Sequence, residues 1–321
     1  MTDRIKILSL GRLDPRISTV LAERFDVFRD DTQDIESILA THAADIQAIV
    51  TRGGGGTSAA LFARLPNLKL VSSFGVGYDG VDVQAAARAG IVVTNTPDVL
   101  NDEMADFTVG LLLATIRQLP QAERHLRAGH WGKGQNFPLG TSLRSRHIGI
   151  VGMGRIGRVI ARRLEGFDVP VSCYVRRPQP DLNLPTHASL LELAKAVDTL
   201  IIVLPGGEQT RNIINAEILQ ALGPDGILIN VARGSVVDED ALITALQSGT
   251  ILAAGLDVFA KEPQVPDALR QLENVVLLPH IGTATHHTRG RMGDLVIENV
   301  QSWFDGKGPL TPVAETPVPK K

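Results

Sequence analysis

The sequence predicts an α/β protein built from two doubly wound parallel sheets, one of them inserted into the chain of the other. Short apolar runs recur throughout the 321 residues, and most are separated by stretches with a helical pattern. Strands separated by roughly 10 to 15 helical residues are typical of βαβ units in a parallel sheet. The runs fall into two series, and the second begins near residue 147 and ends near residue 278.

The first series occupies residues 1–98. Its expected strands end at glycines or at a proline, and they lie at residues 5–10, 46–50, 68–74 and 91–95. A run of glycines, Gly53 to Gly56, follows Arg52 after the second of these strands. Past residue 287 the chain has a helical pattern again, so we expect residues 288–321 to complete the same domain.

The second series predicts a domain of residues 99–287. Its six expected strands lie at residues 147–151, 171–175, 199–204, 226–231, 252–256 and 275–278. Ahead of them, a long helix is expected from Asn101, and its apolar residues cover most of its circumference, which predicts burial. Residues 120–146 are polar with scattered glycines, and we expect an irregular arm there.

The composition excludes several classes of protein. Hydrophobic residues make up 44% of the chain and the formal net charge is −3, so it has no electrostatic footprint for nucleic acid or an anionic membrane. No apolar run reaches the about 18 residues that cross a bilayer, and the N-terminus lacks a secretory pattern. The single cysteine, Cys173, lies in an apolar run, which predicts a buried thiol and a cytoplasmic protein.

The second series opens on a glycine motif between the strand-like IGIV and a helix-like run, and its residues are Gly152, Met153, Gly154, Arg155, Ile156 and Gly157. In this context the first glycine allows a tight turn, the second lets the backbone approach a pyrophosphate, and the third lets helix pack on strand. The helix N-terminus adds N–H groups and a positive dipole for phosphates. The motif therefore predicts a dinucleotide-binding unit of the Rossmann type.

A pair of arginines stands where such units often carry an acid. A carboxylate is expected about 20 residues past the glycine motif, where it binds the ribose hydroxyl of NAD. Here that place holds Arg176 and Arg177, and no Asp or Glu lies between Val169 and Gln179. Guanidinium groups would instead bind the 2′-phosphate of NADP(H). The sequence predicts a preference for NADP(H), with NAD(H) still possible; the alternative is a solvated basic turn.

Three ionisable residues lie at or after the ends of expected strands, namely Arg233, Glu262 and His280. Open α/β sheets build their sites at the carboxyl ends of strands. A guanidinium can hold a carboxylate or polarise a ketone, a histidine can transfer a proton near neutral pH, and a bonded glutamate can fix its tautomer. Together they could reduce a 2-keto acid, although each alone also has a structural interpretation. We expect no metal site, because His286 and His287 fit the start of a helix.

Six stretches, in family order and spacing over nearly the whole chain, resemble the D-isomer-specific 2-hydroxyacid dehydrogenase family. They are FGVGYDGVD (74–82), TNTPDVLNDEMADFTVGLLL (94–113), VGMGRIG (151–157), LINVARGSVVDEDAL (228–242), AAGLDVFAKEP (253–263) and LLPHIGTAT (277–285). Within the family the chain looks most similar to glyoxylate/hydroxypyruvate reductases and hydroxyphenylpyruvate reductases, in which basic or hydroxyl residues often replace the acid. The resemblance implies a flavodoxin-like catalytic domain, split into 1–98 and 288–321, around an inserted Rossmann cofactor domain of 99–287.

The resemblance also implies roles for individual residues. Arg233 would bind the carboxylate and keto oxygen of the substrate, His280 would be the acid/base, and Glu262 would be its partner. The backbone N–H groups of Val76 and Gly77 would also receive the carboxylate. Besides the glycine motif and the arginine pair, the expected cofactor contacts are Val175, Leu204, Pro205, Val231, Asp257 (to the nicotinamide carboxamide) and Gly282.

Three expectations concern the surroundings of this site. Arg52 lies either near the substrate or in solvent, and the glycines after it predict a roomier or more mobile pocket. The family usually forms homodimers through the cofactor domain, which fits the long helix and the arm. Trp131 would then either reach toward the partner's active site or serve as a packing anchor.

The sequence therefore predicts an enzyme that uses NADPH to reduce small 2-keto acids to D-2-hydroxy acids. Glyoxylate and hydroxypyruvate are the expected substrates, with 4-hydroxyphenylpyruvate as an aromatic option. One alternative is an NAD-dependent member of the family, and the missing acid argues against it. Another is a corepressor-like protein that senses NAD(P)H, and the intact Arg233, Glu262 and His280 favour an enzyme over it.

Overall fold

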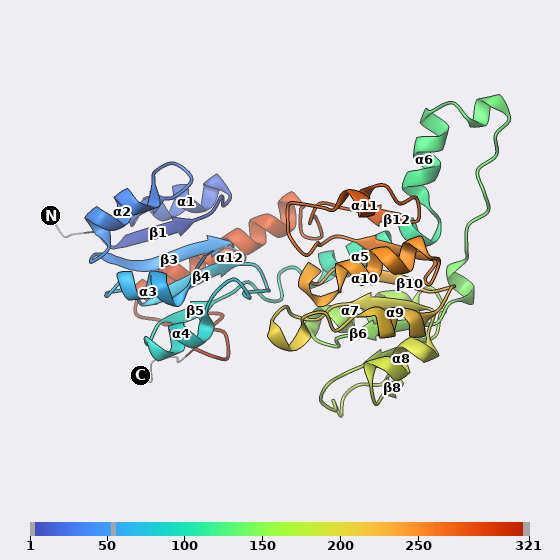
Figure 1. The fold of residues 1–321 in the computed structure, drawn as a ribbon. Helices are drawn as coiled ribbons and strands as arrows, with labels where there is room; N and C mark the ends of the chain where they lie inside the picture. The colour runs from blue at the N-terminus through green and yellow to red at the C-terminus, as the bar shows by residue number, and fades with distance from the viewer. Residues whose placement is uncertain (1–3, 53–55, 317–321) are drawn as a thin grey trace. The chain divides into compact units, whose positions relative to one another are not determined.

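The computed structural model describes residues 4–52 and 56–316, and the chain divides into two compact units (Figure 1). Unit 1 combines residues 1–100 with residues 285–321, and unit 2 is the continuous segment 101–284. Each unit contains a parallel sheet with helices packed on it, so the predicted α/β fold with two parallel sheets is confirmed. The glycines at positions 53–55, for which a roomy or mobile loop was expected, lie outside the described residues.

Unit 1 has a five-stranded sheet in the order β2-β1-β3-β4-β5. Its strands are β1 (Lys6–Leu10), β2 (Asp26–Arg29), β3 (Ile46–Arg52), β4 (Leu70–Phe74) and β5 (Val92–Thr94). The edge strand β2 is not anticipated by the sequence, because it is only half-buried and has no continuous apolar run. In β3, Ala48 and Val50 face one core and Ile49 faces the other, as the two-residue period of a strand requires.

Helices pack on both faces of this sheet. One core includes residues of α1 (Pro15–Ala22) and α12 (His286–Phe304). The opposite core includes residues of α2 (Ile35–His42), α3 (Ala59–Arg64) and α4 (Val83–Arg88). The contact of α12 with β4 brings the Ser72 hydroxyl within 3.5 Å of the Val296 carbonyl oxygen. The last helix therefore packs with the first hundred residues, although unit 2 separates them in the sequence.

Unit 2 has a seven-stranded sheet in the order β12-β11-β10-β9-β6-β7-β8. Its strands are β6 (Ile148–Val151), β7 (Val171–Tyr174), β8 (Thr186–His187), β9 (Thr199–Ile202), β10 (Ile227–Asn230), β11 (Ala253–Leu256) and β12 (Val275–Leu277). The six strands that the sequence predicts are all present. The structure adds β8, a two-residue strand at the edge, which is too short to show a periodic pattern.

The helices of unit 2 begin with α5 (Asn101–Ile116), which is buried as predicted. It packs closely on β11, since a Cβ added to Gly255 would lie 2.4 Å from the Thr115 hydroxyl oxygen. The remaining α-helices are α6 (Leu119–Arg127), α7 (Arg155–Glu165), α8 (Leu190–Ala196), α9 (Ala216–Leu222), α10 (Glu239–Gln247) and α11 (Asp267–Arg270). The expectation of an irregular arm over 120–146 is wrong at its start, because α6 occupies residues 119–127, with Pro120 in its first turn, where a proline is tolerated.

The strand order of unit 2 reverses at β6. From there the chain runs outward through β7 and β8, then returns to β9 on the other side of β6 and continues to β12. In doubly wound sheets this switch point is where ligands bind, at the carboxyl ends of the strands. The loops after β6, β7 and β9 are therefore neighbours by topology.

Cys173 lies in β7 with no exposed surface, which confirms the predicted buried thiol. Burial raises the pKa of this thiol above its ordinary value. Among the described residues, no helix combines the length and apolar character that crossing a bilayer requires.

Candidate active site

The glycine motif forms the turn between β6 and α7. Gly152 has φ 108°, a conformation that side-chain-bearing residues rarely adopt, and a Cβ there would lie 2.7 Å from the Val203 carbonyl oxygen. A Cβ on Gly157 would lie 2.1 Å from the carbonyl oxygen of Gly152, so α7 can approach the turn only with glycine there. Gly154, the N-cap of α7, has open space around its missing Cβ, and no side chain caps the helix. The first and third glycines thus serve packing, and the second leaves the helix N-terminus accessible.

The arginine pair lies in the turn that follows β7. Both side chains are exposed, and Gly152 N–H bonds the Tyr174 carbonyl at 3.4 Å, which holds this turn beside the glycine motif. Arg176 Nη1 donates to Gln209 Oε1. Within the described residues, no carboxylate pairs with Arg176 or Arg177. The structure therefore keeps two uncompensated cations at the end of β7.

The far end of this turn is fixed by α7. Arg158 Nη2 donates to Gln179 Oε1 at 2.6 Å and to Asp181 Oδ1 at 3.1 Å. The acid closest after the arginine pair is thus paired with a different arginine. Of the other expected cofactor contacts, Val175 follows β7, Leu204 and Pro205 follow β9, and the buried Val231 follows β10.

Arg233 lies in a rigid loop after β10. Asn230 holds this loop, since its Nδ2 donates to the Arg233 carbonyl at 3.0 Å and its Oδ1 accepts from the Ala232 N–H at 3.0 Å. The neighbouring Gly234 is pressed against the loop after β11, because a Cβ there would lie 1.9 Å from the Phe259 carbonyl carbon. The loops that carry Arg233 and Glu262 are therefore packed backbone to backbone.

Glu262 and His280 form a hydrogen-bonded pair. His280 Nδ1 lies 2.7 Å from Glu262 Oε2, and the other carboxylate oxygen accepts the Phe259 N–H at 3.0 Å. Burial by itself would raise the pKa of Glu262, but the hydrogen bonds from His280 and Phe259 and the charges of His280 and Arg233 outweigh it and lower that pKa. Glu262 is therefore ionised at neutral pH, and Arg233 is close enough to influence it.

Asp257 fixes the turn that carries His280. Its side chain is buried, with Oδ1 accepting the Ile281 N–H at 2.8 Å and Oδ2 accepting the Gly282 N–H at 2.9 Å. Its carbonyl accepts the His280 N–H at 2.9 Å. Burial raises the pKa of Asp257 despite these hydrogen bonds. The histidine is thus tied to the end of β11 by three backbone amides.

Unit 1 contributes a separate set of expected residues after its own strands. Thr96 and Asn95 hold the loop after β4 through bonds to Gly75 and to the Val76 carbonyl. Within the described chain, the N–H groups of Val76 and Gly77 donate to no acceptor. Two unpaired amides in one turn are suited to bind an anion.

Two cations accompany this loop in unit 1. Arg52 ends β3 in register with Phe74 at the end of β4, and its side chain is exposed. Arg289 lies in the first turn of α12, where burial and the positive charge of Arg52 lower its pKa. Two neighbouring like charges destabilise each other, which favours an anion beside them.

The described residues contain no cluster of His, Cys, Asp or Glu suited to a metal ion.

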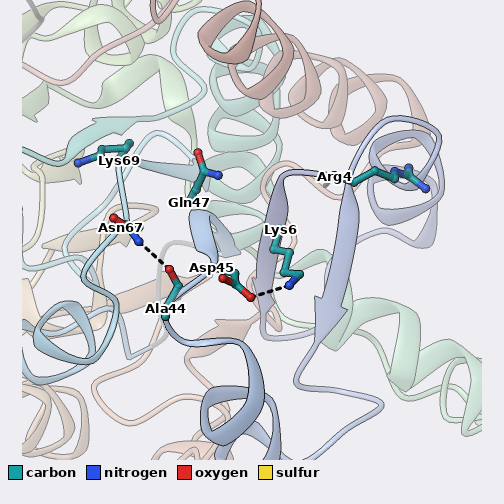
Figure 2. A pocket seen from close by; sticks show the side chains of 7 residues that line it. All are labelled: Arg4, Lys6, Ala44, Asp45, Gln47, Asn67 and Lys69. Carbon is teal, nitrogen blue, oxygen red and sulfur yellow. Dashed lines mark hydrogen bonds and ion pairs between the residues drawn. The ribbon is translucent and has the colours of Figure 1, made fainter. Parts of the chain in front are cut away.

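A cavity of about 300 Å³ in unit 1 is lined by Arg4, Lys6, Ala44, Asp45, Gln47, Asn67 and Lys69 (Figure 2). It lies at the amino ends of the strands, with its Lys6 paired to Asp45 at 2.6 Å. A second cavity, of about 460 Å³, is bordered by Leu10, Asp30 and Gly56. Neither is lined by an expected site residue.

Comparison with known proteins identifies the family. The model of the D-isomer-specific 2-hydroxyacid dehydrogenase NAD-binding domain matches residues 109–282. The chain belongs to the D-isomer-specific 2-hydroxyacid dehydrogenase family. The resemblance seen in the sequence is therefore confirmed, and the protein is an NAD(P)-dependent oxidoreductase of this family.

Several family members are similar to the chain over its whole length. A glyoxylate/hydroxypyruvate reductase of Arabidopsis thaliana is 43% identical, covering 97% of this chain and 99% of the relative. A hydroxyphenylpyruvate reductase of Plectranthus scutellarioides is 44% identical with the same coverage. The NADPH-dependent glyoxylate/hydroxypyruvate reductase of Sinorhizobium meliloti, solved with NADP and malonate, is 49% identical, with a TM-score of 0.93 over 99% of both chains.

Three residues near these loops were not predicted from the sequence, namely Arg158, Gln209 and Arg289. None belongs to a glycine motif or ends a strand. The strand order β9-β6-β7 was the signal that could have revealed Gln209, because it brings the loops after β7 and β9 to the two sides of the glycine motif.

Proposed function

We propose that this 2-hydroxyacid dehydrogenase reduces small 2-keto acids with NADPH as the preferred cofactor, and that glyoxylate and hydroxypyruvate are its main substrates. The similarity to glyoxylate/hydroxypyruvate reductases supports the substrate class, and the hydroxyphenylpyruvate reductase relative supports 4-hydroxyphenylpyruvate as a further candidate. The observation that carries the proposal is the turn after β7, which offers two cations and no unpaired carboxylate.

The residues of unit 2 fit a bound dinucleotide. The open space at Gly154 and the uncapped N-terminus of α7 suit a pyrophosphate, and Arg176 and Arg177 suit the 2′-phosphate. Asp257 would hold the carboxamide, with Gly282 beside it and Val231, Leu204 and Pro205 along the cofactor. When bound, the reduced nicotinamide supplies the hydride that the keto carbon receives.

His280 is the proposed proton donor. Its Nδ1 is engaged by Glu262 at 2.7 Å, so Nε2 is the atom that can give a proton to the keto oxygen. The ionised Glu262 accepts the Nδ1–H of His280, which fixes the tautomer and the orientation of the ring. Arg233, held by Asn230, would bind the carboxylate and polarise the keto oxygen, so that negative charge developing there is stabilised.

Unit 1 would bind the substrate carboxylate. The unpaired amides of Val76 and Gly77 are suited to its oxygens, and Arg52 adds positive charge at the same edge of the sheet. We assign unit 1 as the substrate domain and unit 2 as the cofactor domain on these grounds.

The protein would act as a homodimer through residues 119–146, which comprise α6 and the irregular segment after it. Four large apolar side chains of these residues are exposed in the single chain, namely Leu119 (52%), Leu126 (57%), Trp131 (66%) and Leu139 (100%). Exposed apolar side chains concentrated in one segment favour an interface.

Initial rates test the proposed function directly. NADPH and NADH are each measured against glyoxylate, hydroxypyruvate and 4-hydroxyphenylpyruvate. We expect NADPH to give the higher kcat/KM with glyoxylate or hydroxypyruvate. A clear NADH preference would leave the arginine pair as a solvated turn, and no turnover with any of the three acids would contradict the substrate class.

The arginine pair can be tested separately. Arg176→Ala combined with Arg177→Ala should raise the KM for NADPH by about 10- to 100-fold, because charge-assisted hydrogen bonds to a phosphate are lost. The KM for NADH should change little. The control is Arg270→Ala, which removes an exposed arginine of unit 2 that is paired with Asp267.

A further inference from the structure

The loop after β9 contacts the arginine pair from the opposite side of the glycine motif. This loop contains a short 3₁₀ turn, Glu208–Thr210, and Gln209 Oε1 in it accepts a hydrogen bond from Arg176 Nη1. In the sheet, β6 lies between β7 and β9. The contact between Arg176 and Gln209 therefore joins the two loops that flank the glycine motif.

The charges in this loop are arranged so that Arg176 meets a neutral partner. The acid of the 3₁₀ turn, Glu208, is paired with Arg211 at 2.9 Å, and this hydrogen bond lowers the pKa of Glu208. Gln209 contributes only an amide oxygen. A guanidinium has five N–H donors, so one bond to an amide leaves the charge and most donors available for an anion.

The turn that holds Arg176 is fixed at its other end as well. Arg158 on α7 binds Gln179 at 2.6 Å and Asp181 at 3.1 Å. The end of the turn, at residues 179–181, is thus held by α7, while the Arg176 side chain is held by Gln209. A long, exposed arginine otherwise loses considerable rotamer freedom when it binds a ligand.

We propose that Gln209 is a positioning residue that orients Arg176 toward the 2′-phosphate and so contributes to the selectivity for NADPH over NADH. This inference rests on the proposed function, because it assumes that Arg176 binds that phosphate. Gln209 lowers the conformational entropy that Arg176 loses when it binds the phosphate. It does so without neutralising the charge of Arg176, whereas an acid at the same position would neutralise it. Selectivity then depends on the loop after β9 as well as on the arginine pair.

The test compares Gln209→Ala and Gln209→Glu with the wild type in steady-state kinetics at saturating glyoxylate. Gln209→Ala should raise the KM for NADPH by about 3- to 10-fold, the range expected for one hydrogen bond, and leave kcat and the KM for NADH unchanged. Gln209→Glu should raise the KM for NADPH further, because its carboxylate pairs with Arg176 and repels the phosphate. Glu208→Gln is the matched control on the same turn. The ratio of its KM for NADH to its KM for NADPH should equal that of the wild type.

A binding measurement gives a readout that is independent of turnover. Adenosine 2′,5′-bisphosphate and adenosine 5′-monophosphate are titrated calorimetrically into each variant. Gln209→Ala should raise the Kd of adenosine 2′,5′-bisphosphate by about 3- to 10-fold and leave the Kd of adenosine 5′-monophosphate unchanged. When Arg176 is already replaced by alanine, Gln209→Ala should change neither Kd. Unchanged thermal unfolding shows that each variant is folded.

The outcomes separate this inference from the function on which it rests. If the wild type prefers NADPH but Gln209→Ala leaves its KM unchanged, or weakens NADPH and NADH equally, the positioning role is wrong and the proposed function stands. If the wild type shows no preference for NADPH and does not distinguish the two adenosine phosphates, both are wrong.

Discussion

His280 shows how one residue is placed by several others. It has φ 53°, a left-handed conformation that is uncommon outside glycine, and the bonds to Asp257 and Leu278 hold its backbone there. The sequence predicted that His280, Glu262 and Arg233 follow strands, because each comes after an apolar run. It did not predict this backbone conformation, or that both oxygens of Asp257 bind the turn itself, because these depend on contacts between separate loops.

Glu262 places a negative charge next to His280. The lowered pKa of Glu262 means that its carboxylate is ionised throughout the neutral range, so it accepts the Nδ1–H of His280 and holds that tautomer. Glu262→Gln keeps the shape but removes the charge. Keto-acid reduction should fall by about 10- to 100-fold at neutral pH, because the tautomer and orientation of His280 are no longer fixed.

The control for this variant is Glu239→Gln, because Glu239 also accepts a loop amide, from Ala260 at 3.1 Å, but does not contact His280. Its rate of keto-acid reduction should match that of the wild type. A rate unchanged by Glu262→Gln would contradict the pairing of Glu262 with His280.

The lowered pKa of Glu262 also has a consequence for the stability of the fold. The contribution of this carboxylate to the free energy of unfolding is present above the ordinary pKa of 4.5 and is lost as the pH falls through the lower folded-state value, so wild type and Glu262→Gln should converge in stability in acid.

Among the elements, buried apolar strands were predictable and strands with little burial were not. β6, β9 and β10 are fully buried, so their sequences IGIV, TLII and ILIN are largely apolar. β2 is only half-buried and β8 is two residues long, so neither shows a clear burial pattern. α6 was not predicted because its composition is polar. Its position depends on contacts with the rest of unit 2, since Gln121 Nε2 donates to the carbonyls of Glu273 and Val275.

Two glycines in the turn from β6 to α7 have different surroundings, so their replacement should have different effects. Gly157→Ala places a methyl group 2.1 Å from the Gly152 carbonyl, so it should destabilise the fold by about 1–3 kcal/mol. Gly154→Ala meets no protein atom within 4 Å and should cost less than about 1 kcal/mol. It should nevertheless raise the Kd for NADP by about 10-fold or more, because the methyl group occupies the space that a pyrophosphate needs.

Denaturant unfolding and calorimetric titration measure the two effects independently. Each glycine variant serves as the control for the other, because their order should invert between the two measurements. Equal losses of stability in both variants would show that the two glycines have the same role.

The whole molecule is organised so that its proposed chemistry lies in one continuous segment. The glycine motif, the arginine pair, Arg233, Glu262 and His280 all belong to unit 2, whereas unit 1 is assembled from both ends of the chain. The sequence predicted an insertion from the place where the second series of strands starts and stops. The oligomeric state was not derivable from patterns within the chain, because an interface depends on a second copy.

Residues 119–146 would hold the dimer together through their exposed apolar side chains. Replacing Leu126 and Leu139 by serine removes exposed apolar surface and should leave the stability of the single chain nearly unchanged. Light scattering should then give about the 34.4 kDa mass of one chain, where the wild type gives about twice that mass. The control is Leu310→Ser in unit 1, where the leucine is 51% exposed against 57% for Leu126, and this variant should remain dimeric. A wild type with the mass of one chain would contradict the dimer.

The reactivity of the single cysteine can be used to measure internal motion of the protein. Cys173 is the only thiol, it has no exposed surface, and it lies in β7 just before the turn that carries the arginine pair. A thiol reagent can reach it only when unit 2 opens, so the labelling rate under native conditions reports that opening at one known place. A ligand that binds at the loops after β6 and β7 and stabilises unit 2 should slow the reaction as its occupancy rises. Cofactor affinity can therefore be followed without any substrate, in every variant that retains this cysteine.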